Sequence, residues 1–91
     1  TELNLSNNDI GAEGARELAT AMKENKNIKL ADLGLAYNDI GDEGARELAM
    51  ALLENNTLMI LNLRRNSFND EMKETFKSLP RLKSGALEIK F

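Results

Sequence analysis

Three short segments of the chain alternate leucine with other residues and then reach the same asparagine. They are Leu3 and Leu5 before Asn8, Leu33 and Leu35 before Asn38, and Leu61 and Leu63 before Asn66. Leucine at every second position is typical of a short strand with one buried face. We therefore expect strands near residues 3–5, 33–35 and 61–63.

A helical pattern follows each of these segments. Apolar residues recur at Ala15, Leu18, Ala19 and Met22, and again at Ala45, Leu48, Ala49 and Leu52. This i, i+3, i+4, i+7 spacing forms one apolar stripe along an amphipathic helix. It predicts helices near residues 12–24, 42–54 and 70–79. Since a helix joining two strands of one sheet in the same phase is a right-handed crossover, the strands should be parallel.

The chain repeats itself. The residues from Asn8 to Ala19 return from Asn38 to Ala49, 30 positions later, and eleven of these twelve positions are identical. A third, weaker copy begins 28 positions further on, at Asn66. One strand–helix unit cannot cover its own apolar face, so stacked units are expected to share one continuous core.

The third copy changes where the first two are most alike. Gly44, Ala45 and Leu48 are replaced by Met72, Lys73 and Phe76. Terminal units of repeat proteins are atypical because they present a polar outer surface. Pro80 is expected to stop the third helix.

The last residues alternate again. Leu87, Ile89 and Phe91 would share one face of a short strand at the edge of the sheet. We interpret residues 80–91 as a C-terminal cap. The sequence starts inside a strand-like segment without Met, so we interpret the chain as a fragment of a longer one.

The frame Leu-x-x-Leu-x-Leu-x-x-Asn-x-Ile-Gly resembles the leucine-rich repeats over about residues 2–79. The 28–30 spacing and the signature Gly-x-Glu-Gly-Ala-Arg-Glu-Leu-Ala are similar to the ribonuclease-inhibitor-like subfamily, which includes NOD-like receptors, tropomodulins and the activators of Ran GTPase. The resemblance implies an α/β solenoid with parallel strands on a concave face and helices on a convex face. It would form a single domain over 1–91, with repeats at about 1–27, 28–55 and 56–79 and the cap at 80–91.

The resemblance also implies a structural role for Asn8, Asn38 and Asn66. In the family, this side chain binds the backbone of neighbouring loops and forms a ladder from one repeat to the next. A carboxamide suits that role because it both donates and accepts hydrogen bonds where loop backbone groups are buried.

Composition and charge narrow the function classes. Nucleic-acid binding requires clustered Lys and Arg, and the net charge of −3 gives no sign of such a basic surface. The absence of Cys and His removes disulfides, zinc-thiolate sites and His-dependent triads. The longest apolar run, Leu48 to Leu53, is far shorter than the roughly 20 residues of a membrane span. We expect an intracellular, cytoplasmic protein that binds neither nucleic acid nor membrane.

The acidic residues at the helix starts do not form a calcium loop. The twelfth position is Thr20 counted from Asp9 and Met50 counted from Asp39, so the bidentate Glu is missing. Acidic residues in a first helical turn complement the helix dipole without any metal. With no phosphate-cradling spacing such as Gly-x-x-x-x-Gly-Lys, we expect no metal, no cofactor and no enzyme activity.

The candidate partner-binding residues are those that the leucine frame leaves in solvent along and just after the strands. They are Asp32, Ala36, Tyr37, Asn62, Arg64 and Arg65. Tyr and Arg are enriched at binding hot spots, so Tyr37, Arg64 and Arg65 lead this set.

The resulting hypothesis is a protein–protein interaction module that binds its partner on the concave face. Two alternatives stay open. One is a small-GTPase regulator of the Ran-activator type. The other is a structural or self-assembly segment of a larger receptor or scaffold. We also expect weak self-association through the bare edge of the first strand.

Overall fold

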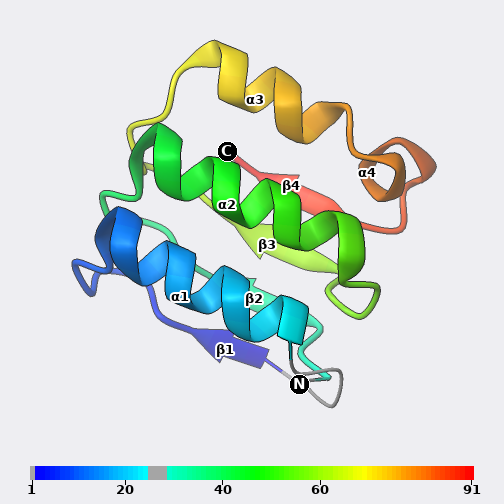
Figure 1. The fold of residues 1–91 in the computed structure, drawn as a ribbon, viewed down its shortest axis with the longest axis horizontal. Helices are drawn as coiled ribbons and strands as arrows, with labels where there is room; N and C mark the ends of the chain where they lie inside the picture. Colours follow the sequence, from blue (N-terminus) through cyan, green and yellow to red (C-terminus); the bar gives the residue numbers. More distant parts are fainter. Residues whose placement is uncertain (1, 25–28) are drawn as a thin grey trace.

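The computed structural model of the chain describes residues 2–24 and 29–91. The elements are β1 (Glu2–Asn4), α1 (Gly11–Glu24), β2 (Asp32–Gly34), α2 (Gly41–Glu54), β3 (Ile60–Asn62), α3 (Asp70–Lys77), α4 (Pro80–Ser84) and β4 (Glu88–Lys90) (Figure 1). The expected boundary between the first two repeats, at residues 27 and 28, lies outside the described residues.

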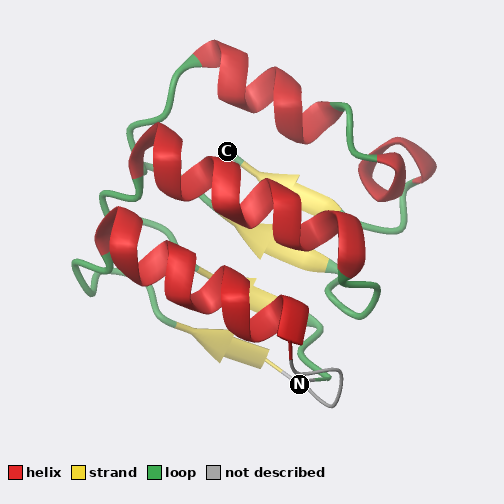
Figure 2. Cartoon of the chain, in the orientation of Figure 1, coloured by secondary structure: helices red, strands yellow, loops and turns green. Residues whose placement is uncertain are grey.

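The four strands form one parallel sheet in chain order, β1-β2-β3-β4. Leu33 lies between Leu3 and Leu61 in the register. Helices α1, α2 and α3 all lie on the same face of this sheet (Figure 2), which leaves the other face uncovered. We call the uncovered side the open face and the opposite side the helix face. The predicted α/β repeat fold with parallel strands is confirmed.

Each strand begins and ends one residue before the predicted range. The second leucine of each pair still donates its N–H across the sheet, over 2.8 Å from Leu5 to Gly34 and 2.9 Å from Leu35 to Asn62. The chain then turns away, because the following asparagine binds the loop backbone. The leucines themselves form the core with the helix stripes, and Leu33, Leu61 and Leu48 are fully buried.

Helices α1 and α2 pack closely because Gly44 has no side chain. A Cβ at this position would lie 3.0 Å from the Cα of Ala12 and 3.1 Å from the Cβ of Ala15. Met72 takes the place of this glycine in the third repeat. Figure 1 shows α3 standing further from α2 than α1 does, as the bulkier side chain requires.

All three phenylalanines of the chain gather under the displaced helix α3. The rings of Phe68, Phe76 and Phe91 lie with centroids 5.9–6.0 Å apart. Phe76 is fully buried, and the other two are partly buried against the core. Tilted and edge-on rings at this separation are a favourable aromatic packing. Phe68 and Phe76 stand at the positions of Ile40 and Leu48 in the second repeat, so larger rings replace aliphatic side chains there.

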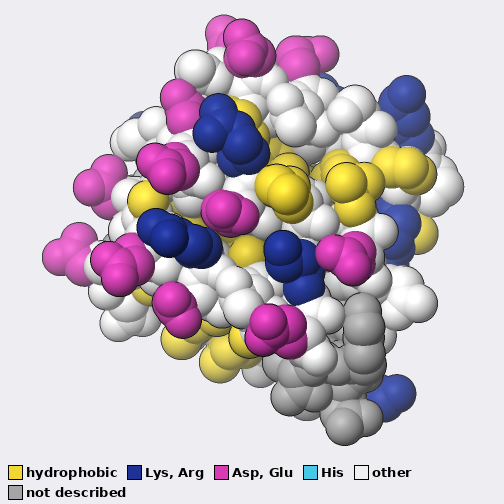
Figure 3. All heavy atoms as spheres, in the orientation of Figure 1, with side chains coloured by type: hydrophobic (Ala, Val, Ile, Leu, Met, Phe, Trp, Pro, Cys, Tyr) yellow, Lys and Arg dark blue, Asp and Glu magenta, His cyan; other side chains and the backbone are white. Residues whose placement is uncertain are grey.

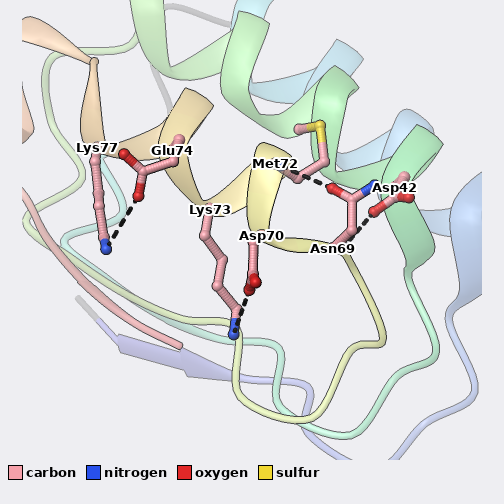
Figure 4. A network of polar contacts seen from close by, with 7 residues as sticks. All are labelled: Asp42, Asn69, Asp70, Met72, Lys73, Glu74 and Lys77. Atoms are coloured by element: carbon pink, nitrogen blue, oxygen red, sulfur yellow. Dashed lines mark hydrogen bonds and ion pairs between the residues drawn. The ribbon is translucent and has the colours of Figure 1, made fainter.

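The start of α3 also differs from the starts of α1 and α2. Asn69 stands where the second repeat has Gly41, whose φ is +73°. The Asn69 side chain accepts a hydrogen bond from the N–H of Met72 at 2.9 Å and so caps the helix. Its backbone N–H donates to Asp42 at 2.7 Å, which ties α3 to the start of α2 (Figure 4).

The prediction that the third helix runs to residue 79 and is stopped by Pro80 is wrong. Helix α3 ends at Lys77, and Pro80 is the first residue of the short helix α4. A proline fits that position because the first N–H of a helix has no partner within it. Gly85, with φ +87°, ends α4. The predicted last strand is confirmed as β4, paired in parallel with β3.

Asn38 binds the backbone of two loops at once. Its Oδ1 accepts hydrogen bonds from the N–H of Asn8 at 2.8 Å and of Ile10 at 3.3 Å. Its Nδ2 donates to the carbonyls of Leu5 at 2.9 Å and Leu35 at 3.1 Å. The Asn38 side chain is fully buried, and these bonds satisfy backbone groups that are buried or partly buried.

Asn66 repeats this arrangement one unit later. Its Oδ1 accepts from the N–H of Asn38 at 2.8 Å, and its Nδ2 donates to Leu35 at 2.8 Å and to Leu63 at 3.0 Å. Asn8 is exposed, and its side chain donates to two carbonyls of its own loop. The asparagines therefore join the three loops in chain order.

Replacing Asn38 with Leu should lower the free energy of unfolding by roughly 1–3 kcal/mol, because buried N–H and C=O groups of two loops lose their partners. The matched change Asn8→Leu should have a much smaller effect, since Asn8 is exposed and binds only its own loop. Urea denaturation followed by circular dichroism measures both. Equal midpoints for the two variants would contradict the assigned role of Asn38.

Candidate interaction surface

The residue before each ladder asparagine has a left-handed backbone. These residues are Asn7, Tyr37 and Arg65, with φ of 63°, 58° and 60°. Asn tolerates this conformation, whereas for most side chains it costs about 1–2 kcal/mol. Tyr37 and Arg65 therefore adopt a conformation that the loop imposes on them.

The loop imposes this conformation through hydrogen bonds on both sides of the turn. The N–H of Tyr37 donates to the carbonyl of Arg64 at 2.9 Å, and the next residue, Asn38, is the buried ladder residue. Strained residues of this kind persist where the surrounding structure over-determines them, and they cluster at binding sites. The Tyr37 side chain is 55% exposed, so it gains little from burial in this fold.

A hollow of about 690 Å³ opens at the carboxyl ends of β2 and β3. We call it the strand-end hollow. It brings together five of the six partner-binding residues predicted from the sequence: Ala36, Tyr37, Asn62, Arg64 and Arg65. The sixth, Asp32, does not line it. Asp32 lines a smaller hollow of about 230 Å³ with Lys90, and Asn62 lines both hollows.

Asn62 has a role in shaping the strand-end hollow. Its Oδ1 accepts a hydrogen bond from the backbone N–H of Arg64 at 3.1 Å. Asn4 makes the equivalent bond to Ser6 at 3.0 Å in the first repeat. Asn62 therefore supports the turn from which Arg64 projects.

The strand-end hollow is also lined by residues that the strand pattern does not indicate, among them Phe68, Lys73 and Phe91. Lys73 occupies the position of Ala45, which is fully buried in the second repeat. In the third repeat the longer Lys73 side chain lines the hollow instead. The exchange of Ala45 for Lys73 is the sequence feature that could have indicated this residue. From the sequence alone, this exchange is interpreted as part of the polar surface of a terminal repeat.

The helix face has a different character. Lys and Arg side chains are interspersed with Asp and Glu across it (Figure 3). Two large apolar side chains of α2, Met50 and Leu53, are exposed among them. Single exposed apolar residues are normal on protein surfaces. Interspersed charges of both signs produce no strong electrostatic potential that would attract a charged partner.

The first repeat carries an apolar groove of about 280 Å³ along its outer edge, lined by Leu3, Leu18, Ala21 and Met22 among others. We call it the edge groove. The equivalent positions in the second repeat are covered by the first. Leu3 is 41% exposed and its counterpart Leu33 only 1%. Ala21 is exposed, whereas its counterpart Ala51 is fully buried. The edge groove is thus the surface that one repeat presents to another.

Within residues 2–24 and 29–91, no three acidic side chains gather closely enough to hold a metal ion. In the same part of the chain, no helix has the length and apolar character needed to cross a membrane.

A family model described as Leucine Rich repeat matches three stretches of the chain, residues 1–19, 26–49 and 54–71. Together they cover more than half of it, and each contains one of the three asparagines of the ladder. No curated protein matches the chain.

The strained turns generate a prediction about stability. Tyr37→Asn and Arg65→Asn should each raise the free energy of unfolding by about 0.5–1 kcal/mol, because Asn accepts a positive φ more readily. The control Asn7→Tyr should change it in the opposite direction at the equivalent turn. Urea denaturation of the three variants measures these effects, and a loss of stability in both Asn variants would contradict the assignment of strain.

Proposed function

The chain belongs to the leucine-rich-repeat family, whose domains generally mediate protein–protein interaction, and we propose that it binds a partner protein at the strand-end hollow of its open face. The observation that carries this proposal is the convergence of Tyr37, Arg64 and Arg65 on one hollow at the exits of adjacent strands. Tyr and Arg are the residue types that most often dominate binding energy.

The way the fold holds these side chains also supports the proposal. Parallel strands hold their outward residues in rows about 4.8 Å apart. The hydrogen bonds of Asn38 and Asn66 fix the turns that follow, so little conformational entropy remains to be lost on binding. A site with this preorganisation binds more tightly than the same residues on a mobile loop.

Within the family, we place the chain with the ribonuclease-inhibitor-like repeats. The support is the 28–30 residue spacing and the Gly-Ala-Arg-Glu-Leu-Ala signature at the start of α1 and α2. By this assignment the sheet is the concave face of a solenoid and the helices are its convex face.

A second candidate function is self-assembly through the edge groove. The observation that favours it is the difference in exposure between Leu3 and Leu33, and between Ala21 and Ala51. Among the strands of the described residues, β1 pairs only with β2 and lies at the edge of the sheet. An open edge beside apolar side chains favours pairing with a second copy of the chain.

For the partner-binding proposal, Arg64→Ala combined with Arg65→Ala should weaken binding by roughly 1–4 kcal/mol, the range of hot-spot residues. The control is Arg46→Ala on the helix face, which should have little effect. The partner is first isolated on the immobilised domain and identified, and its affinity for each variant is then measured by calorimetry. If Arg46→Ala proves more damaging than the double change, the proposed surface is wrong.

For the self-assembly candidate, sedimentation equilibrium should show a weak, concentration-dependent increase in mass. Ala21→Glu should suppress this increase, because it places a charge in the edge groove. Met50→Glu, at an exposed position on the helix face, should leave it unchanged. A strictly monomeric mass at high protein concentration would remove this candidate.

A further inference from the structure

Three cationic side chains meet in the strand-end hollow. Arg64, Arg65 and Lys73 all line it, and none of its lining residues is acidic. The chain as a whole has a net charge of −3. The hollow is therefore a local positive site on an acidic protein, and this contrast selects for a negatively charged ligand.

These cations are available to a ligand. Within the described part of the chain, neither arginine takes part in an ion pair. Lys73 pairs with Asp70 at 4.0 Å, and the two side chains project together from one side of α3 (Figure 4). Their side chains are 42% and 101% exposed, and an exposed pair at this distance is weak. Lys73 can therefore exchange Asp70 for a carboxylate of a bound molecule.

The other lining residues are of mixed character: Asn62, Asn66 and Ser67 are polar, and Ala36, Leu63 and three aromatic rings add apolar surface. Ala36, which was expected to face solvent, is buried at 7% exposed, while the partly buried rings of Phe68 and Phe91 belong to the aromatic cluster. The exposed ring of Tyr37 stands at the same hollow. A small inorganic anion would leave this surface uncovered, whereas an acidic peptide with an apolar side chain uses both parts of the hollow.

Nucleic acid fits this surface less well than peptide does. Its affinity comes from many phosphate contacts along an extended basic stripe. Here three cations share one hollow, and elsewhere Lys and Arg alternate with Asp and Glu, as on the helix face (Figure 3), so they form no extended basic stripe there. The observations therefore favour a protein segment as the ligand.

We infer that the strand-end hollow receives an acidic segment of the partner, in which carboxylates bind Arg64, Arg65 and Lys73 and a neighbouring apolar side chain packs against Tyr37 and Phe91. This inference rests on the proposed function and states the chemistry of the partner. Arginine is suited to this role because its guanidinium binds a carboxylate through two parallel hydrogen bonds.

The test uses a fluorescein-labelled peptide, Gly-Glu-Glu-Leu-Glu-Glu-Gly, and fluorescence anisotropy with the whole chain. An analogue of this peptide with Gln in place of every Glu should bind at least about tenfold more weakly. A tenfold loss of affinity corresponds to about 1.4 kcal/mol of binding free energy. Arg64→Ala, Arg65→Ala and Lys73→Ala should each weaken binding of the acidic peptide several-fold. Raising the salt concentration should weaken it further, because exposed charges are screened.

Matched controls distinguish this site from a general attraction to positive charge. Lys77→Ala removes a cation from the same helix outside the hollow and should leave peptide binding unchanged. Arg64→Lys combined with Arg65→Lys keeps the charge and should retain part of the affinity that the alanine changes remove. Equal binding of the Gln peptide, no binding of the acidic peptide at about 1 mM, or tighter binding of a labelled oligonucleotide would each overturn the inference.

The captured partner separates a failure of this inference from a failure of the proposed function. If Tyr37→Asn weakens its binding but Arg64→Glu with Arg65→Glu does not, the hollow binds the partner through apolar contacts and the acidic-segment inference is wrong. If neither change has an effect and Arg46→Ala does, the partner binds the helix face and the proposed function at the hollow is wrong as well.

Discussion

The side-chain amide of Asn38 binds the backbone of its own loop and of the loop before it, and Asn66 does the same one repeat later. Each strand exit turns sharply under the sheet and buries N–H and C=O groups that no regular element satisfies. A carboxamide supplies both a donor and an acceptor at that point, and few other side chains do so. These hydrogen bonds keep adjacent loops in register. The register in turn fixes the positions of Tyr37 and Arg65, which directly precede Asn38 and Asn66.

The same loops explain why the binding surface lies at the strand exits. The turn that precedes Asn38 forces Tyr37 into a left-handed backbone, and the turn that precedes Asn66 does the same to Arg65. The strand-end hollow then needs one further change, which is the break in the repeat. In the third repeat Met72 replaces Gly44 and Lys73 replaces Ala45, and Lys73 lines the hollow together with the rings of Phe68 and Phe91. Regular repeats therefore position one side of the hollow, and the irregular last repeat forms the other.

Most of the fold could be predicted from the sequence because the same two periods recur in every repeat. Leu33 and Leu48 sit in patterns with periods of 2 and 3.6 residues, and both are fully buried. The end of α3 could not be predicted, because a proline stops one helix and starts another equally well. Pro80 does the second, while α3 has already ended at Lys77.

The candidate site was predictable only in part. Alternation along the strands identified Arg64, and the strand exits together with the hot-spot residue types added Tyr37 and Arg65. Alternation also grouped Asp32 with them, because it states the face of the sheet but not the position along the strand. The hollow also contains Phe68, Lys73 and Phe91, from the last repeat and the cap. The exchange of Ala45 for Lys73 is visible in the sequence, but the alternation along the strands does not indicate which side chains of this repeat reach the hollow.

Amide chemical shifts of the isotope-labelled domain, recorded with and without its isolated partner, test the proposed binding surface most directly. The account predicts that the largest changes fall on residues 36–37 and 64–68, at the strand-end hollow, while the exposed positions of α1 and α2 change little. Changes confined to those helices, with the signals of Tyr37 and Arg65 unaltered, would contradict it.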